Sequence, residues 1–259
     1  MAFARSMSVV IPAYNEAGNL EGAVHDTVHA LRTFDDFEVI IVDDGSTDGT
    51  GEVADRLAST MPRVKAIHHR PNRGFAASYQ TGLKHATMAF FTFVPGDHEV
   101  AAESVEEIFN AVGSADVVVP YHGTPWNRTW HRRLLTWICT TQINVLFGYN
   151  LKYFQGPAVY PTELARVLPI GTTGFFFATE MLLNALMMGY SCVEVPLVHH
   201  ERSYGHSKAV KPGNIVDAQI TILRLWWSLR IRGERVARPG SGNGDHSLLS
   251  PGASPSNGL

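Results

Sequence analysis

The chain has 259 residues, of which 45% are hydrophobic, and a formal net charge of −3, so it is long enough for one well-packed domain of ordinary globular composition. Two cysteines are too few for a disulfide framework and fit a reducing compartment. The N-terminus lacks the pattern of a signal peptide, and no run approaches the ~20 apolar residues that a bilayer span needs. We therefore expect neither a leader nor a spanning helix.

The charge is unevenly distributed along the chain. Residues 1–119 carry 8 Lys/Arg and 17 Asp/Glu, whereas residues 199–259 carry 8 and 4. An acidic first part of the chain (residues 1–119) suits the binding of a metal ion, and a basic last part (residues 199–259) suits the binding of an anion. Charged residues on solvated helix faces would give the same uneven distribution of charge.

The first half alternates strand and helix patterns. Short apolar runs at 8–11, 37–44, 64–69, 88–94 and 115–120 predict strands, and the periodic segments between them predict helices. This βαβ order predicts an α/β fold with a mainly parallel central sheet and helices on both faces.

The second half has a different pattern. Residues 126–148, 174–189 and 213–232 predict helices, and 191–200 predicts a strand. The tail, residues 238–259, is rich in Gly, Ser and Pro and is expected to be disordered. We expect one catalytic domain over 1–237, with a nucleotide-binding half (1–119) and an acceptor- and membrane-facing half (120–237).

Polar clusters follow four of the predicted strands. They are Tyr14–Glu16, Asp43–Asp44, Asn72–Arg73 and Asp97–Glu99. In open α/β sheets ligands bind at the carboxyl ends of the strands, so these clusters predict a binding site.

Two of the carboxylates suggest a metal site. Asp97 and Glu99 follow the strand at 88–94, and carboxylate oxygens suit Mg²⁺ or Mn²⁺, with diphosphate oxygens and water completing the shell. The alternative is an acid-rich helix N-terminus, because AAESVEE follows.

The pair Asp43 and Asp44 can accept hydrogen bonds from a base or a ribose, or can shape a turn. We expect Asp43 to hold the loop and Asp44 to face the ligand. The first turn, PAYNEAGN, has no G-x-G-x-x-G pattern, which disfavours a nicotinamide enzyme.

Several ordered motifs carry a family resemblance. The segments SVVIPAYNEAGNL, EVIIVDDGSTDGT, NRGFAASYQTGL and the acids after FFTFV resemble inverting family 2 glycosyltransferases with the GT-A fold. The second half is similar to dolichol-phosphate mannose synthases and related polyprenyl-phosphate glycosyltransferases, which end this region in R-x-x-G-x-S-K. Here that ending is Arg202, Gly205, Ser207 and Lys208.

The resemblance implies roles for individual residues. It implies a metal site at Asp97 and Glu99, catalytic roles for Asp97, Arg202 and Lys208, and nucleotide contacts from Pro12, Tyr14, Glu16, Asp43 and Asp44. Two positions depart from the family pattern: Pro95 stands where the first acid of Asp-x-Asp is usual, and Gln155 lies in a motif that usually carries an acid.

The mechanism that follows is direct displacement at the anomeric carbon, with the metal steadying the diphosphate. An acceptor phosphate, with a second pKa near ~6, is already a nucleophilic anion at neutral pH. A hydroxyl acceptor would need a base, for which Asp97 or Glu180 would be the candidates.

Aromatic and basic residues of the rear helices favour a membrane interface. If 126–148 is one helix, its Trp126, Trp130 and Trp137 share a stripe with basic neighbours, and Trp226 and Trp227 lie in the last helix. The alternative is that these rings pack in the core.

Three functions remain open at this stage. The first is sugar transfer from a nucleotide sugar to a polyprenyl phosphate by a peripheral enzyme at the cytoplasmic membrane face, without a nucleic-acid partner. The second is transfer to a soluble or glycan acceptor. The third, suggested by Pro95, is a non-catalytic nucleotide-sugar-binding protein.

Overall fold

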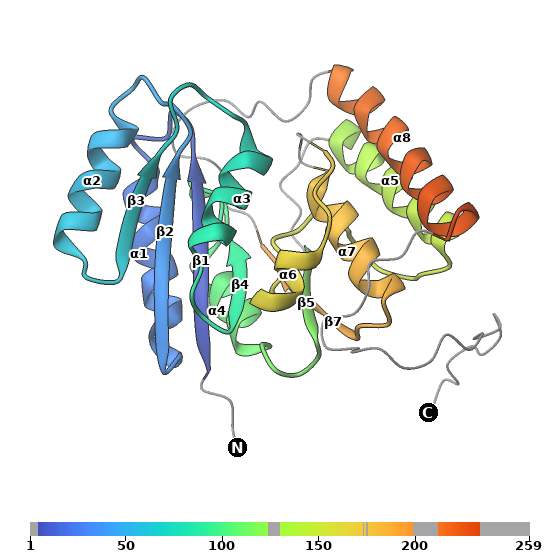
Figure 1. The fold of residues 1–259 in the computed structure, drawn as a ribbon, viewed down its shortest axis with the longest axis horizontal. Coiled ribbons are helices and arrows are strands. Elements are labelled where there is room, and N and C mark those ends of the chain that lie inside the picture. Colours follow the sequence, from blue (N-terminus) through green and yellow to red (C-terminus); the bar gives the residue numbers. More distant parts are fainter. Residues whose placement is uncertain (1–4, 124–129, 173, 175, 199–211, 234–259) are drawn as a thin grey trace.

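A computed structural model describes residues 5–123, 130–172, 174, 176–198 and 212–233 of the chain. They form two β-sheets flanked by helices (Figure 1). The predicted tail at 238–259 lies outside the described residues, so its expected disorder stays a prediction.

The larger sheet has the strand order β3-β2-β1-β4-β6. Strands β1, β2, β3 and β4 are mutually parallel, and the short β6 is antiparallel to β4. Near-continuous burial of β1 and β2 explains their unbroken apolar runs, because both faces of the sheet are covered. The bounds are β1 Ser6–Ala13, β2 Asp36–Asp43, β3 Val64–His68, β4 Phe90–Phe93 and β6 Tyr160–Pro161.

The mainly parallel α/β sheet is therefore confirmed, with one difference. The fifth strand, β5 (Val117–His122), does not join the larger sheet but pairs in parallel with β7 (Cys192–Leu197). A bridge between Val118 and Val159 links β5 to the residue that precedes β6. An apolar run predicts a strand but not its partner, which explains why the sequence did not reveal the second sheet.

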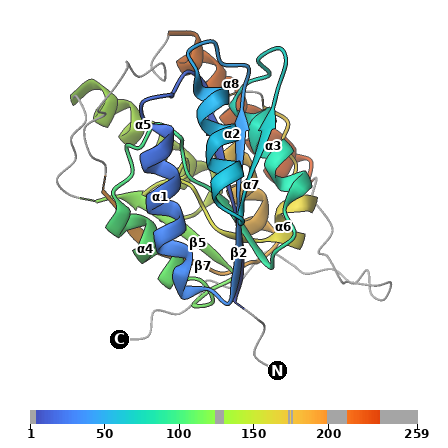
Figure 2. The same cartoon turned by 90° about the vertical axis from the view of Figure 1, so that its left-hand side faces the viewer.

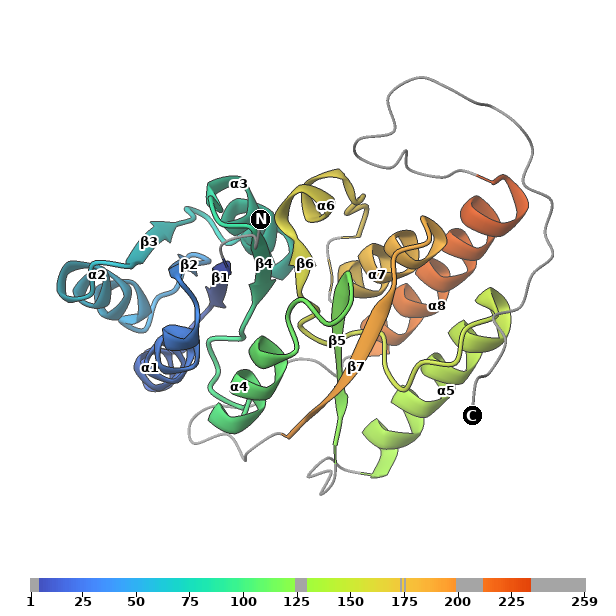
Figure 3. The same cartoon turned by 90° about the horizontal axis from the view of Figure 1, so that it is seen from below.

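Helices cover both faces of the larger sheet, as Figures 2 and 3 show. One face packs α1 and α4 and the other packs α3, with two apolar clusters on the two sides. The helices in the first half of the chain, with one short 3₁₀ turn, have the bounds α1 Leu20–Ala30, η1 Leu31–Thr33, α2 Thr50–Thr60, α3 Phe75–His85 and α4 Ala102–Asn110.

The rear helices continue the core of the α3 side. α7 is buried along almost its whole length, whereas α5 and α8 lie side by side farther from the larger sheet (Figures 1 and 3). No described helix is long and apolar enough to cross a membrane. These elements span α5 Trp130–Phe147, α6 Thr162–Val167, α7 Phe177–Met187, α8 Pro212–Trp226 and the π-helical turn η2 Trp227–Ile231.

Candidate functional site: the carboxyl edge of the parallel sheet

The loops after β1 and β2 are joined by hydrogen bonds. The amide of Asn15 donates to Ser46 Oγ (3.0 Å), and the amide of Thr47 donates back to Asn15 Oδ1 (2.9 Å). The amide of Glu16 donates to Thr50 Oγ1 (2.8 Å). Asn15 has a φ of 57°, a left-handed conformation that asparagine tolerates better than most residues. The two loops that carry the predicted nucleotide contacts therefore form one unit.

Asp43 is fully buried and holds its own loop, as expected. Its Oδ1 accepts the Ser46 amide (3.0 Å), and its Oδ2 lies 3.0 Å from His68 Nδ1 and 3.1 Å from Arg70 Nη1. Burial raises the pKa of Asp43, but hydrogen bonds from His68, Ser46 and Arg70 outweigh it and lower that pKa to about 2. Asp43 is thus a charged structural anchor.

Asp44 is also buried, with a carboxylate that faces the protein. Its Oδ1 accepts the Arg73 amide (2.8 Å) and lies 2.7 Å from His69 Nδ1, and its Oδ2 accepts the Gly74 amide (2.8 Å). A carboxylate offers about four lone-pair sites, so these three contacts leave room for a ligand hydrogen bond and do not test whether Asp44 faces the ligand. Its nucleotide role stays a prediction, and the visible effect of Asp44 is to shape the loop at 72–74.

The imidazole of His69 was not anticipated in this network. It is 5% exposed and joins Asp44 to Thr81 of α3 through a 2.9 Å contact at Nε2. The sequence signal was present in the paired histidines His68 and His69 at the end of β3, but their aspartate partners, Asp43 and Asp44, lie 25 residues away in the chain. Gly45, with a φ of 74°, lets the Asp44 loop approach the Asn72 amide, since a Cβ there would lie 2.8 Å from that nitrogen.

The chain after β4 continues beside β1. The amides of Val94 and Gly96 donate to Val10 O (2.9 Å) and Pro12 O (3.1 Å). Along this segment every second backbone amide donates to β1. Pro95 lies between two such residues, where no amide donor is needed, so proline fits at this position. A Cβ on Gly96 would lie 3.0 Å from Pro12 O, and this close approach brings the Asp97 loop against the first nucleotide loop.

Asp97 and Glu99 occur in one tight loop, where the Glu99 amide donates to Asp97 Oδ1 (3.2 Å). His98 between them has a φ of 55°, and its Nε2 lies 2.7 Å from Asp26 Oδ2 of α1. Its ring lies against Gly22, where a Cβ would come within 2.5 Å of it. His98 therefore anchors the loop of the two acids to α1.

The remaining predicted residues fall into two groups. Pro12 and Ala13 are the last two residues of β1 that pair with β2. Tyr14, the next residue, is 40% exposed. Arg202 and Lys208 lie outside the described residues, so the structure does not test them. Among the residues that it describes, no group of three His, Cys, Asp or Glu side chains could hold a metal ion.

Glu180, the alternative base for a hydroxyl acceptor, is held by protein groups. It is 5% exposed, its Oε2 accepts the Gly171 amide (2.9 Å), and its Oε1 lies 3.4 Å from Arg224 Nη2 of α8. This geometry supports a role in joining α7 to α8.

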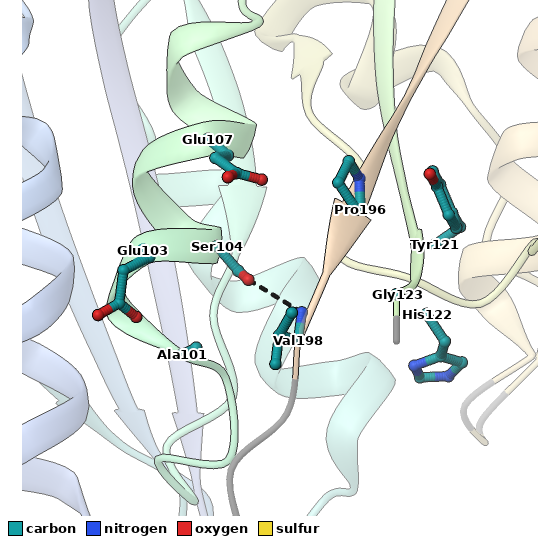
Figure 4. Close-up of a pocket in the computed structure, with 9 residues that line it drawn as sticks. All are labelled: Ala101, Glu103, Ser104, Glu107, Tyr121, His122, Gly123, Pro196 and Val198. Carbon is teal, nitrogen blue, oxygen red and sulfur yellow. Dashed lines mark hydrogen bonds between the residues drawn. The ribbon is translucent and has the colours of Figure 1, made fainter. Parts of the chain in front are cut away.

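A pocket of about 570 Å³ opens beside the Asp97 loop, between α4 and the carboxyl ends of β5 and β7 (Figure 4). Its polar groups include Glu103, Glu107, Tyr121 and His122, and the Ser104 hydroxyl accepts the Val198 amide (2.9 Å) across it. Among the described residues, none of those predicted to form the site lines this pocket, because the sequence did not show that β5 and β7 pair there.

Comparisons with known proteins agree with this architecture. The chain is 30% identical over 241 residues to a polyprenol monophosphomannose synthase of Mycolicibacterium smegmatis, covering 88% of this chain and 89% of that one. It is 27% identical to an undecaprenyl-phosphate mannosyltransferase of Micrococcus luteus, covering 87% and 95%.

A solved structure has the same fold. Glucosyl-3-phosphoglycerate synthase from Mycobacterium tuberculosis, in complex with Mn²⁺, UDP and phosphoglyceric acid, matches with a TM-score of 0.62 at 18% identity, over 86% of this chain and 78% of that one. The fold is therefore the GT-A glycosyltransferase fold. The family model "Glycosyl transferase family 2" matches residues 8–169, more than half of the chain. This chain belongs to glycosyltransferase family 2 and is a glycosyltransferase that takes its sugar from a nucleotide-sugar donor.

Proposed function

We propose that this glycosyltransferase transfers a sugar from a nucleotide diphosphate sugar to a polyprenyl phosphate, with inversion at the anomeric carbon. The observation that carries the proposal is the likeness to two enzymes named for polyprenyl-phosphate acceptors, which extends over nearly all of this chain and of both relatives. Such coverage includes the rear half, where an acceptor would be expected.

The donor end is assigned to the joined loops after β1, β2 and β3. Exposed Tyr14 can stack on a base, and Asp44 fixes the amides of the loop at 72–74. Pro12 and Glu16 flank Tyr14, and the second contact of Glu16, to Asn19 Nδ2 (2.7 Å), ties it to the start of α1. Asp43 contributes from behind by fixing the Ser46 loop.

A divalent metal, Mg²⁺ or Mn²⁺, fits between this site and Asp97. Two carboxylates in one loop suit a hard cation whose other positions are filled by diphosphate oxygens and water. Asp97 and Glu99 would hold the ion, and its charge would stabilise the departing diphosphate. The solved relative with Mn²⁺ and UDP supports this proposal.

The site that binds the acceptor phosphate needs positively charged side chains rather than a general base. A phosphate monoester dianion attacks without losing a proton, so no side chain has to remove one. We assign Arg202 and Lys208 to hold the acceptor phosphate or the diphosphate, because the fork of arginine and the mobile charge of lysine both suit phosphate oxygens. The lipid acceptor places the enzyme at a membrane surface, which we propose is the cytoplasmic face.

A second candidate acceptor is a hydroxyl-bearing glycan. The pocket beside the Asp97 loop favours it, since Glu103, Glu107 and Tyr121 can hydrogen-bond sugar hydroxyls, whereas two carboxylates repel a phosphate.

One screen distinguishes the acceptors. UDP- and GDP-sugars are offered with a short-chain isoprenyl phosphate, with an oligosaccharide or with neither, in Mn²⁺ or in excess chelator. The proposal expects transfer only to the phosphate and only with metal. Arg202→Ala should abolish it without lowering the melting temperature. Transfer to the oligosaccharide alone would identify the second candidate.

A further inference from the structure

The outer faces of α5 and α8 form one exposed apolar surface. Of the large hydrophobic side chains exposed in the described part of the chain, all but two lie on these helices and η2. The exposed fractions reach 75% at Trp130, 64% at Trp137, 76% at Val145, 59% at Ile220 and 52% at Trp227.

The spacing on each helix shows that these side chains share one side. On α5 the exposed apolar positions recur at 130, 134, 137, 138 and 145, and on α8 and η2 at 220, 223, 227 and 231. Steps of three and four residues place them on single helix faces. Trp226 does not belong to this surface, because it packs half-buried against the core.

The two faces are continuous. α5 and α8 lie side by side in Figures 1 and 3, Gln219 of α8 approaches Cys139 of α5, and the Arg230 guanidinium donates to Phe147 O at the end of α5. Buried residues of both helices, including Ile143 and Ile222, belong to the same core cluster, so the helices are fixed relative to one another. The exposed strips therefore form a preformed surface.

The charge around this surface favours an anionic lipid layer. The sequence of α5 holds two arginines and no acid, and that of α8 with η2 holds two arginines and one acid. Positive charge is in excess here even though Arg224 is paired with Glu180 of α7, whereas the chain as a whole has a charge of −3. Two such surfaces would bring like charges together, which disfavours a second copy of the chain as the occupant. Exposed tryptophans with arginines instead match the headgroup boundary of a bilayer.

We infer that the outer faces of α5 and α8 dock together on a bilayer that contains anionic lipid, with Trp137 and Trp227 inserted at the headgroup level. This inference rests on the proposed lipid acceptor, but vesicle binding itself is measured without any acceptor or donor. Docking of this kind would hold the rear half of the enzyme flat on the layer from which the acceptor is drawn.

The test measures co-sedimentation of the full chain with vesicles of phosphatidylcholine alone and with 30% phosphatidylglycerol. We expect binding to the anionic vesicles, weakened by salt, and a partition coefficient about tenfold lower in the double variant Trp137→Glu, Trp227→Glu. Val167→Glu is the matched control, since Val167 of α6 is 40% exposed but lies outside the surface. Unchanged melting temperatures check that the variants fold.

Three results would overturn the inference: no vesicle binding by the wild type, equal binding by the folded double variant, or a dimeric wild type that the double variant makes monomeric. Transfer to a short-chain isoprenyl phosphate in solution separates this failure from that of the proposed function. A docking defect leaves such transfer intact, whereas an enzyme with another acceptor shows none even as wild type.

Discussion

The first half of the chain, residues 1–119, and the second half, residues 120–237, differ in which side chains they bury and which they expose. At the carboxyl edge of the front sheet, charged side chains are buried and bonded to backbone amides and to one another, as with Asp43, Asp44 and His69. In the rear half, apolar side chains are turned outward on α5 and α8. On the functions proposed above, the front half would fix the position of a small polar ligand, and the rear half would present a surface to an extended apolar one.

The largest effect is expected at the acids of the front half. Asp97→Asn removes a proposed metal ligand, so turnover should fall by at least about 100-fold, because the ion is assigned to the charge of the leaving diphosphate. The comparison variant is Glu52→Gln, which alters an exposed carboxylate of α2. Steady-state rates across a Mn²⁺ titration measure both, and full activity of either wild type or Asp97→Asn in excess chelator would remove the metal assignment.

Two isoleucines of α8 test whether its outer side is exposed and its inner side buried, because their replacement should change the free energy of unfolding by different amounts. Ile222 is fully buried and Ile220 is 59% exposed, two residues apart on the helix. Ile222→Ala should lower the free energy of unfolding by about 2–5 kcal/mol, whereas Ile220→Ala should change it by less than about 0.5 kcal/mol. Denaturant unfolding of both variants measures this difference, and equal losses would mean that the exposed side of α8 is covered in solution.

Replacing His69, which joins Asp44 to Thr81, is expected to have a smaller effect, seen mainly in the KM for the donor. His69→Ala leaves the Asp44 carboxylate with fewer partners, so the loop at 72–74 should become less ordered and the KM for the donor should rise by about tenfold, with a smaller change in kcat. His69→Asn, which can still donate to Asp44, should restore most of the loss. Thr81→Val removes only the other hydrogen bond of the ring and should be mild. A variant that loses kcat and leaves KM unchanged would contradict a positioning role at the donor.

These contrasts also show what the sequence could predict. The strand-end clusters correctly pointed to the edge where the loops of Asn15, Ser46 and Asp97 meet, because parallel strands bring their carboxyl ends together. The burial of Asp44 and its contact with His69 depend on the path of the loop at 72–74, which no local periodicity encodes. In the rear half, helical spacing predicted α5 and α8, but only their packing shows that Trp226 faces inward and Trp227 outward.

The smallest expected effect concerns the pH dependence of the front half. The hydrogen bond to Asp43 raises the pKa of His68 above its usual 6.5, against the opposing effect of burial, and the contact with Asp55 adds to the rise. A raised histidine pKa stabilises the fold fully below 6.5, and this contribution is lost as pH rises through the folded-state pKa. The lowered pKa of Asp43, about 2, stabilises the fold above 3.8 and is lost only as pH falls through about 2.

The contribution of the pair should therefore be largest between about pH 4 and 6.5 and should decline toward pH 9. His68 is partly exposed, so the decline attributable to it should be about 1 kcal/mol or less. His68→Gln should flatten that part of the stability curve, whereas His25→Gln, at an exposed histidine of α1, should leave it unchanged. Because the front half owes its order to such buried polar contacts, a His68→Gln curve parallel to that of the wild type from pH 6 to 9 would show that Asp43 is held by Ser46 and Arg70 without help from the imidazolium charge.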